Sequence, residues 1–180
     1  SRTKTVYFVY SGEVMLYNLT KHGNRKVIFI LGKGQLLNQS IVSKKPNALF
    51  CEAVCPVKVI EIAEEQFLQL MEQSHALTRA VLREYERNLW RMGHQLKNTT
   101  GNMQMERKIA AKLWKLGRDF GVDTEDGVMI DIDLTITLMA DLVGAPRENV
   151  SRACKVLTDR GLIRYGNKRF ILTDSDGLAE

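Results

Sequence analysis

Residues 135–172 read TITLMADLVGAPRENVSRACKVLTDRGLIRYGNKRFIL, and their pattern defines the fold of the C-terminal part of the chain. A helix is predicted after Thr135, whose hydroxyl suits an N-cap. Its apolar residues recur at helical spacing and are Ile136, Met139, Ala140 and Val143. Gly144 ends this helix, and Pro146 suits the first turn of a second one, because a proline there leaves no N–H without a partner.

The second helix has one apolar and one polar face. The apolar positions are Val150, Ala153, Cys154 and Leu157. The polar face carries Arg147, Glu148, Ser151, Arg152 and Lys155. Arginine makes paired hydrogen bonds to guanine, glutamate accepts from cytosine and serine bonds to either base, so this face matches base edges in a DNA major groove. An ordinary solvated helix face is the alternative.

A β-hairpin is predicted at Leu162–Leu172, with a two-residue turn at Gly166–Asn167, a dipeptide that tolerates positive φ. Helix, tight turn, helix and hairpin together predict a winged helix-turn-helix, which places its second helix in a major groove. The residues expected to meet DNA phosphates are Thr135, Thr137, Lys155, Arg164, Lys168 and Arg169.

The positive charge of the chain is concentrated in this region. From Ala145 to Phe170, seven basic residues stand against two acidic ones, an excess of five. The whole chain of 180 residues has 26 Lys and Arg against 21 Asp and Glu, a net charge of +5. Because basic side chains neutralise phosphates, this segment predicts binding to double-stranded DNA that weakens as salt rises.

The composition is that of a globular protein, with 44% hydrophobic and 26% charged residues. No apolar run approaches the ~20 residues of a membrane span, and the start lacks a signal-peptide pattern. We therefore expect no membrane partner. Three cysteines without metal-ligand spacing predict neither a disulfide framework nor a metal site, and favour the cytoplasm. An enzyme with a DNA-binding appendage is a rival class, but no catalytic motif supports an enzyme and no catalytic residue is assigned.

Residues 4–63 look like short strands separated by glycine-containing turns. The expected strands are 4–10, 13–18, 25–31, 48–55 and 57–62. Such strands without intervening helices predict an antiparallel β-roll, closed by a short helix at 64–72. The fold class is therefore α+β. The expected parts are a partial effector-sensing β-roll (1–73), a dimerisation helix and hinge (74–103) and a winged helix-turn-helix (104–180).

A long helix is predicted from Ala76 to about Met103. Apolar residues recur along it at alternating spacings of three and four, which is a heptad pattern. This seam comprises Leu82, Tyr85, Leu89, Met92, Leu96 and Met103. The seam predicts a homodimer, and packing of the helix against its own domain is the alternative. Asn98–Asn102 predicts a hinge, because its residues are poor helix formers. A further amphipathic helix then leads to an acidic loop at 119–126.

This order of parts resembles the cyclic-AMP receptor protein and fumarate-nitrate reductase regulator (CRP/FNR) family of bacterial transcription factors. The most specific matches are TVYFVYSGEV at 5–14 and LVGAPRENVSR at 142–152. Members carry further strands before the hairpin at 5–14, so the resemblance implies a roll that is incomplete at its start. It also implies an effector-responsive, allosteric regulator that binds a palindromic DNA site as a homodimer.

The resemblance assigns roles on the recognition helix. Arg147, Glu148 and Arg152 match the Arg-Glu-x-x-x-Arg with which cyclic-AMP receptor-like members read TGTGA-type half-sites. Glu148, Ser151 and Arg152 equally match the Glu-x-x-Ser-Arg of the oxygen-sensing branch, which reads TTGAT. The resemblance therefore implies half-sites that contain the TGA core common to both types. Arg152 would contact the guanine of this core, and Glu148 the opposing cytosine. In activating members the surface corresponding to 122–127 contacts RNA polymerase, although this loop is acidic here.

The expected effector pocket departs from the cyclic-nucleotide pattern. Nucleotide-binding members carry Gly-Glu-Leu and Arg-Ser where this chain has Asn38-Gln39-Ser40 and Asn47-Ala48. A buried phosphate without the arginine would lack a counter-charge, so the expected effector is a small molecule other than cyclic AMP. Lys44 or Lys45 is the alternative partner for a phosphate. The long helix is expected to line the pocket with Trp90, Gly93 and Lys97.

Redox or haem-based gas sensing is the alternative within the same family. A [4Fe–4S] cluster takes four thiolates, and the chain has three cysteines. Cys51 and Cys55 lie four apart on one face of a strand, either as a redox pair or as small apolar fillers. The candidate haem ligands are His22, His75 and His94, with solvated histidines as the alternative.

Overall fold

The structure is a computed structural model that describes residues 5–21, 23–43, 45–99, 104–174 and 177–178. The chain folds into two compact units. The first unit comprises 1–19 and 27–97, and the second comprises 20–26 and 98–180. Among the described residues, no helix combines the length and the apolarity that crossing a membrane requires.

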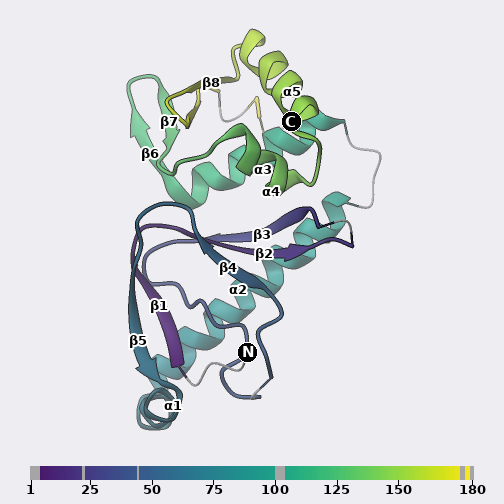
Figure 1. Ribbon diagram of the computed structural model, residues 1–180. Coiled ribbons are helices and arrows are strands. Elements are labelled where there is room, and N and C mark those ends of the chain that lie inside the picture. Colours follow the sequence, from purple (N-terminus) through teal and green to yellow (C-terminus); the bar gives the residue numbers. More distant parts are fainter. Residues whose placement is uncertain (1–4, 22, 44, 100–103, 175–176, 179–180) are drawn as a thin grey trace. The chain divides into compact units, whose positions relative to one another are not determined.

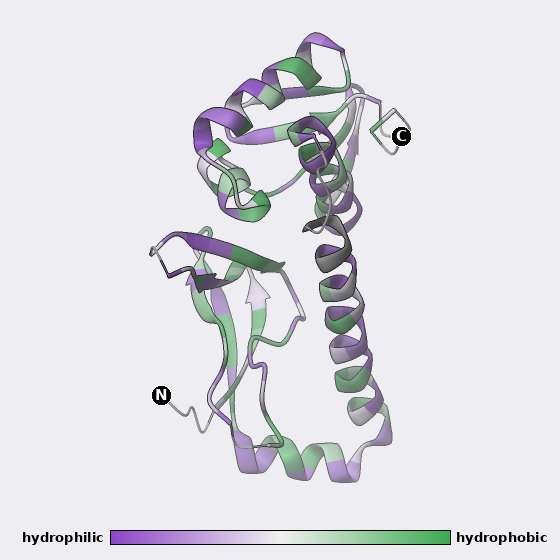
Figure 2. Ribbon diagram, turned by 90° about the vertical axis from the view of Figure 1, so that its right-hand side faces the viewer, coloured by the Kyte–Doolittle hydropathy of each residue, from purple (hydrophilic) through white to green (hydrophobic). Residues whose placement is uncertain are grey.

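The first unit is built from five short strands and two helices (Figure 1). A two-stranded antiparallel sheet pairs β1 (Thr5–Ser11) with β5 (Lys58–Ala63). A three-stranded sheet has the order β3 (Arg25–Leu31), β2 (Val14–Leu19) and β4 (Phe50–Ala53). Helices α1 (Glu64–Gln73) and α2 (His75–Thr99) follow, and α2 runs beside the strands in Figures 1 and 2.

Two apolar clusters hold this unit together. The first joins β1, both helices and the chain after β3, and its buried members are Val6, Leu36, Ile41, Phe67 and Val81. Phe8 packs beside Phe67 with ring centroids 5.4 Å apart. The second cluster lies between β2 and β3 and consists of Leu16, Phe29 and Leu31. Because Val81 of α2 belongs to the first cluster, the long helix is fixed to its own roll.

The second unit combines three helices with a four-stranded antiparallel sheet. Its elements are α3 (Met105–Phe120), β6 (Gly121–Thr124), β7 (Gly127–Ile130), α4 (Ile136–Val143), α5 (Arg147–Asp159), β8 (Ile163–Gly166) and β9 (Arg169–Leu172). The sheet order is β6-β7-β9-β8, so the C-terminal hairpin joins an earlier one through β7 and β9. The side chains buried between helices and sheet include Ile109, Leu113, Ile130, Leu134, Met139, Val150, Leu157, Ile163 and Phe170.

The α+β class, the five N-terminal strands and the C-terminal helices and hairpin are confirmed. The acidic loop predicted at 119–126 is wrong, because α3 continues to Phe120 and residues 121–130 form the β6–β7 hairpin. Strand β6 is short and exposed, so its sequence shows no alternation of apolar and polar residues that would predict a strand. The β6–β7 hairpin is ordered by the pairing of β7 with β9. Of the predicted hinge, residues 98–99 are helical and 100–102 lie outside the described residues.

Candidate nucleic-acid interface

The turn between α4 and α5 is set by local interactions. The Thr135 hydroxyl accepts a hydrogen bond from the Leu138 amide at 3.0 Å, as expected of an N-cap. Gly144 takes the left-handed conformation, with φ 70° and ψ 48°, and its amide donates to the Ala140 carbonyl at 2.8 Å. Glycine adopts this conformation without steric cost, so the chain turns sharply here. Pro146 then caps α5, one position before its first turn.

Helix α5 separates the predicted core residues from the predicted base-reading residues. Its buried side chains are Val150, Ala153, Cys154 and Leu157. Its exposed side chains include Arg147, Glu148, Ser151, Arg152 and Lys155. The four proposed base readers therefore lie together on one exposed face. The opposite, buried face fixes the helix to the core of the second unit.

Arg152 is oriented by a neighbour that the polar-face pattern did not single out. Its Nη2 donates to Oδ1 of Asn149 at 2.6 Å, across one helical turn. Asn149 is half-buried at the base of the exposed face, three residues after the helix cap. An i, i+3 spacing of Asn and Arg is the signal that would have found this pair.

The hairpin β8–β9 turns one residue later than predicted. Asn167 and Lys168 have φ of 49° and 59°, and Gly166 pairs with Arg169. The turn is therefore Asn167–Lys168, and the prediction of Gly166–Asn167 is wrong. Leu172 pairs both with Ile163 of β8 and with Val128 of β7, so the hairpin is part of the larger sheet.

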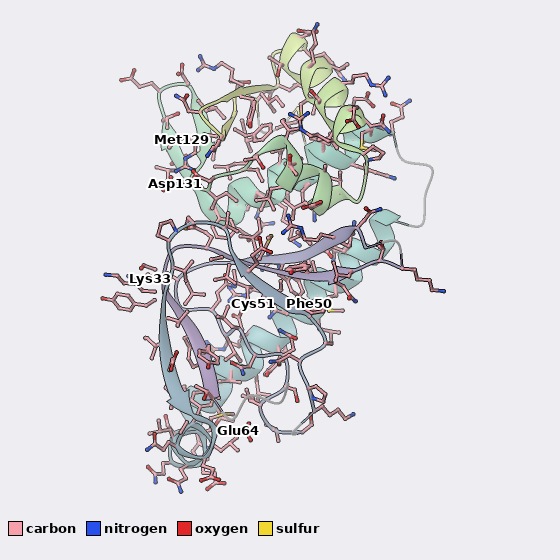
Figure 3. All side chains as sticks on the ribbon, in the orientation of Figure 1. Lys33, Phe50, Cys51, Glu64, Met129 and Asp131 are labelled. Atoms are coloured by element: carbon pink, nitrogen blue, oxygen red, sulfur yellow. The ribbon has the colours of Figure 1, made fainter. Side chains whose placement is uncertain are left out.

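Two of the hairpin arginines make ion pairs with aspartates. Arg169 lies 2.6 Å from a carboxylate oxygen of Asp133 and 3.4 Å from one of Asp131, which follows β7 (Figure 3). Arg164 pairs with Asp126 of the β6–β7 turn. Lys168 is exposed, as is Thr137 at the start of α4, whereas the Thr135 hydroxyl is occupied as a cap. The six predicted phosphate contacts thus have different surroundings.

In the first unit, the predicted pocket residues bind their own chain. Asn38 is 7% exposed; its Oδ1 accepts from the Tyr7 amide at 2.8 Å, and its Nδ2 donates to the Thr5 carbonyl at 3.0 Å. Gln39 accepts from the Leu49 amide at 3.0 Å and donates to the Leu37 carbonyl at 2.9 Å. Both amides therefore fasten the chain after β3 to neighbouring segments.

The other predicted residues of this loop lie near the surface. The Ser40 hydroxyl is 2.8 Å from that of Ser43. The Asn47 side chain accepts from the Gln39 amide at 3.1 Å, and Ala48 is exposed. The structure thus brings Gln39 and Asn47 together, and the hydrogen bond between them closes the loop that they bound.

Helix α2 presents other side chains to the roll than those predicted. Trp90 is 57% exposed, and its ring lies against that of His94 with centroids 3.7 Å apart and planes tilted by 31°; Gly93 is exposed, and the Lys97 side chain lies outside the described part of the chain. Besides Val81, the residues of α2 that contact the roll include Glu84, Tyr85, Arg91 and Gln95. Their helical spacing is a signal in the sequence, but the more regular apolar seam obscures it.

The predicted seam is divided between two environments. Leu82, Leu89 and Met92 are 55%, 72% and 46% exposed, and Figure 2 shows hydrophobic bands along α2. Tyr85 is half-buried against the roll, and its hydroxyl lies 3.5 Å from the Asn38 carbonyl oxygen. The side chain of Leu96 and all of Met103 lie outside the described residues. Helix α2 thus packs on its own roll and leaves an adjacent apolar stripe uncovered.

The cysteines have distinct surroundings. Cys154 is buried in α5, and desolvation raises the pKa of its thiol to about 11. Burial also raises the pKa of Cys51, which lies on β4 beside Phe50 (Figure 3). The Cys55 thiol donates to a carboxylate oxygen of Glu13 at 3.0 Å. Among the described residues, no three His, Cys, Asp or Glu side chains are grouped as a metal ion would require.

Comparisons with known proteins match both units. A cyclic nucleotide-binding domain model matches residues 1–74, and a Crp-like helix-turn-helix domain model matches residues 107–180. A CRP-like cAMP-activated global transcriptional regulator of Mycobacterium tuberculosis is 25% identical over 97% of this chain and 78% of its own length. A global nitrogen regulator of Nostoc is 25% identical over 91% of this chain and 74% of its own.

The fold has a close counterpart among solved structures. FixK2 from Bradyrhizobium japonicum superposes with a TM-score of 0.83 at 21% identity, over 99% of this chain and 87% of that one. The relatives matched by sequence are regulators, and the two matched family models occupy the two ends of one chain in the order that the structure shows. The chain therefore belongs to the CRP/FNR family of transcription regulators, with a cyclic-nucleotide-binding-like unit and a DNA-binding helix-turn-helix.

Proposed function

We propose that this protein binds palindromic DNA as a homodimer and that an effector bound in its first unit controls this binding. The observation that carries the proposal is the exposed face of α5, on which Arg147, Glu148, Ser151 and Arg152 lie together above a buried apolar face. Such a face, preceded by a tight turn and followed by a β-hairpin, matches the docking of a recognition helix in a major groove.

Each base reader has a proposed partner. Arg152 pairs with the guanine of a TGA core and Glu148 accepts from the opposing cytosine, while Arg147 and Ser151 contact flanking positions. A two-fold dimer presents two recognition helices, and its half-sites lie about 34–36 Å apart, one turn of DNA. Lys155 and Lys168 are exposed and contact phosphates, as do Thr135, Thr137, Arg164 and Arg169 once DNA is close.

The exposed apolar stripe on α2 supports the homodimer. Leu82, Leu89 and Met92 recur at intervals of seven and three, as in a two-stranded coiled coil. A second copy of the same helix covers such a stripe by symmetry. The domain boundaries at 73–74 and 103–104 remain part of this proposal, with 74–103 as the dimerisation helix and hinge.

DNA binding is tested by selecting sites from a random duplex library and measuring affinity by fluorescence anisotropy. We expect inverted repeats with a TGA core in each half. Replacing Arg152 by Ala should cost about 1–3 kcal/mol and relax specificity at one base pair. Selected sites without a paired core, or undiminished discrimination in R152A, would contradict the proposal.

The dimer is tested by sedimentation equilibrium. Replacing both Leu82 and Leu89 by Glu should give monomers and lose affinity for the two-half site, because like charges would meet at the seam. The matched control replaces Arg79 and Arg83 by Gln, two exposed positions on the same helix whose substitution lowers net charge by the same two units. A dimer that survives the leucine substitutions would place the interface elsewhere.

We propose an effector other than cyclic AMP. The amide groups of Asn38 and Gln39 already bind the chain itself. In α2, the Oδ1 atom of Asn88 is buried without a hydrogen-bond partner among the described residues. A buried polar atom without a hydrogen bond destabilises the folded chain by about 1–3 kcal/mol, and a hydrogen-bond donor on a bound ligand would offset this cost. The effector is therefore expected between α2 and the roll.

The effector is identified by thermal shift against nucleotides, organic acids, aromatic acids, haem and oxidants, followed by DNA binding with each hit. A ligand of the proposed site should raise the melting temperature of the native chain more than that of N88L. A response to cyclic AMP that depends on Asn88 would overturn the proposed exclusion. A response to haem or oxidants alone would favour the gas-sensing or redox alternative of the family.

A further inference from the structure

We propose that Asn149 is a positioning residue that sets the base specificity of Arg152. The inference rests on the proposed reading of guanine by Arg152 and adds a residue to which neither the recognition motif nor the comparisons assign a role. Its basis is the 2.6 Å hydrogen bond from Arg152 Nη2 to Asn149 Oδ1. Because the donor is charged, this bond is stronger than one between neutral groups.

The chemistry of the guanidinium leaves the base-reading edge intact. Arginine has five N–H donors in a planar fork. Asn149 uses one hydrogen of Nη2, so the other hydrogen of Nη2 remains available together with a hydrogen of the adjacent nitrogen. Two parallel donors are what N7 and O6 of guanine require. The bond therefore fixes the plane of the fork without using the edge that reads the base.

The two side chains differ in exposure in a way that suits these roles. Arg152 is exposed at the surface of α5, while Asn149 is half-buried at its base. A long arginine loses much rotamer freedom when it docks on a base. An anchored head group loses part of that freedom before DNA arrives, so binding to the correct base is favoured over binding to others.

The test measures discrimination, which a merely structural role would leave unchanged. Two duplexes carry inverted TGTGA or inverted TTGAT half-sites, and matched duplexes replace the guanine of each TGA core by adenine. Whichever site the native chain binds more tightly is used for all variants. N149A should lower discrimination between guanine and adenine about five- to tenfold, with less than a twofold change in affinity for unrelated DNA.

The variant N149D separates positioning from charge. It retains the acceptor for Arg152, so it should discriminate as the native chain does, although its added negative charge lowers affinity for every duplex. D159A is the matched control at an exposed position on α5, and circular dichroism with thermal melting monitors folding. Discrimination in N149A equal to that of the native chain, or a loss in N149D as large as in N149A, overturns the inference.

The single and double variants distinguish the two proposals. If R152A discriminates as the native chain does, the proposed base reading itself fails. If R152A loses discrimination and N149A does not, only the role of Asn149 fails. If both lose it, the double variant N149A/R152A should lose no more than R152A alone, because Asn149 acts through Arg152. An additive loss would show that Asn149 contacts DNA independently and would overturn the positioning role.

Discussion

Helix α5 and the hairpin β8–β9 are both basic, yet their basic side chains have different surroundings. On α5, Arg147 and Lys155 are exposed and make no ion pair with a described residue. On the hairpin, Arg164 and Arg169 are paired with aspartates. A cation already paired with a carboxylate gains less from a phosphate than an exposed one does.

The aspartates come from outside the basic segment. Asp126 lies in the β6–β7 turn, and Asp131 and Asp133 follow β7. Pairing of β7 with β9 brings these carboxylates to the hairpin arginines. Counting charges along residues 145–170 therefore overstates the positive charge that the hairpin offers to DNA. In the proposed mode of binding, α5 supplies base specificity, while the paired aspartates restrain the hairpin arginines.

The largest effects should separate Arg152 from Arg169. R152A is expected to lose about 1–3 kcal/mol on the selected site and to relax specificity at one base pair. R169A should weaken all duplexes about equally, because a phosphate contact carries no sequence information. Anisotropy titrations on the selected site and on a scrambled duplex provide the measurement. Equal losses of discrimination in the two variants would remove the distinction between helix and hairpin.

The buried face of α5 predicts a pH-dependent stability. Burial raises the pKa of Cys154 from 9.0 to about 11, so the folded state holds its proton more tightly than the unfolded state. Below pH 9 the thiol is protonated in both states and stability is unaffected. Between pH 9 and 11 only the unfolded thiol ionises, so the free energy of unfolding falls by up to about 1.4 kcal/mol per pH unit, about 3 kcal/mol in all.

Urea denaturation at pH 8, 9.5 and 10.5 measures this contribution. The quantity compared is the slope of the free energy of unfolding against pH, in the native chain and in C154A. Other groups that titrate in this range, lysines and tyrosines among them, are common to both proteins. C51A is measured alongside, because burial also raises the pKa of Cys51 and its contribution has the same sign. Parallel pH profiles for the native chain and C154A would show that Cys154 is hydrated in the folded state.

A substitution in the turn of the β8–β9 hairpin should stabilise the fold. Lys168 has φ 59°, a left-handed conformation that costs a side chain with a Cβ about 1–2 kcal/mol. K168G should therefore stabilise the fold by about 0.5–1 kcal/mol after the greater chain entropy of glycine is counted. Thermal melting measures this, and N167G should gain less because asparagine tolerates the conformation. A lower melting temperature for K168G would argue for a side-chain contact of Lys168 that offsets the strain.

Local sequence predicted much of this molecule, and what it missed depends on strand register, on partners distant in sequence or on side-chain direction. The Thr135 cap and the αL glycine at 144 are local signals, and both are confirmed. The hairpin turn was misplaced by one residue, because Gly166 belongs to the strand and pairs with Arg169, which leaves Asn167 and Lys168 as the turn. The bond between Asn149 and Arg152 depends on side-chain direction, which apolar periodicity does not report. The DNA contacts themselves stay predictions, because they depend on a second molecule.

The smallest expected effect tests the restraint on the hairpin directly. Replacing Asp131 and Asp133 by Asn removes both partners of Arg169 while preserving side-chain size. We expect affinity for unrelated duplex DNA to rise two- to fivefold at low salt, and the slope of log affinity against log salt to steepen by up to about 1, because the phosphate contact of Arg169 no longer competes with carboxylates. The matched control, Asp123→Asn with Glu125→Gln, changes net charge equally but removes exposed carboxylates of β6 and its turn. Because net charge alone would raise affinity in both proteins, only a steeper slope confined to the Asp131/Asp133 variant shows that these carboxylates compete with DNA for Arg169.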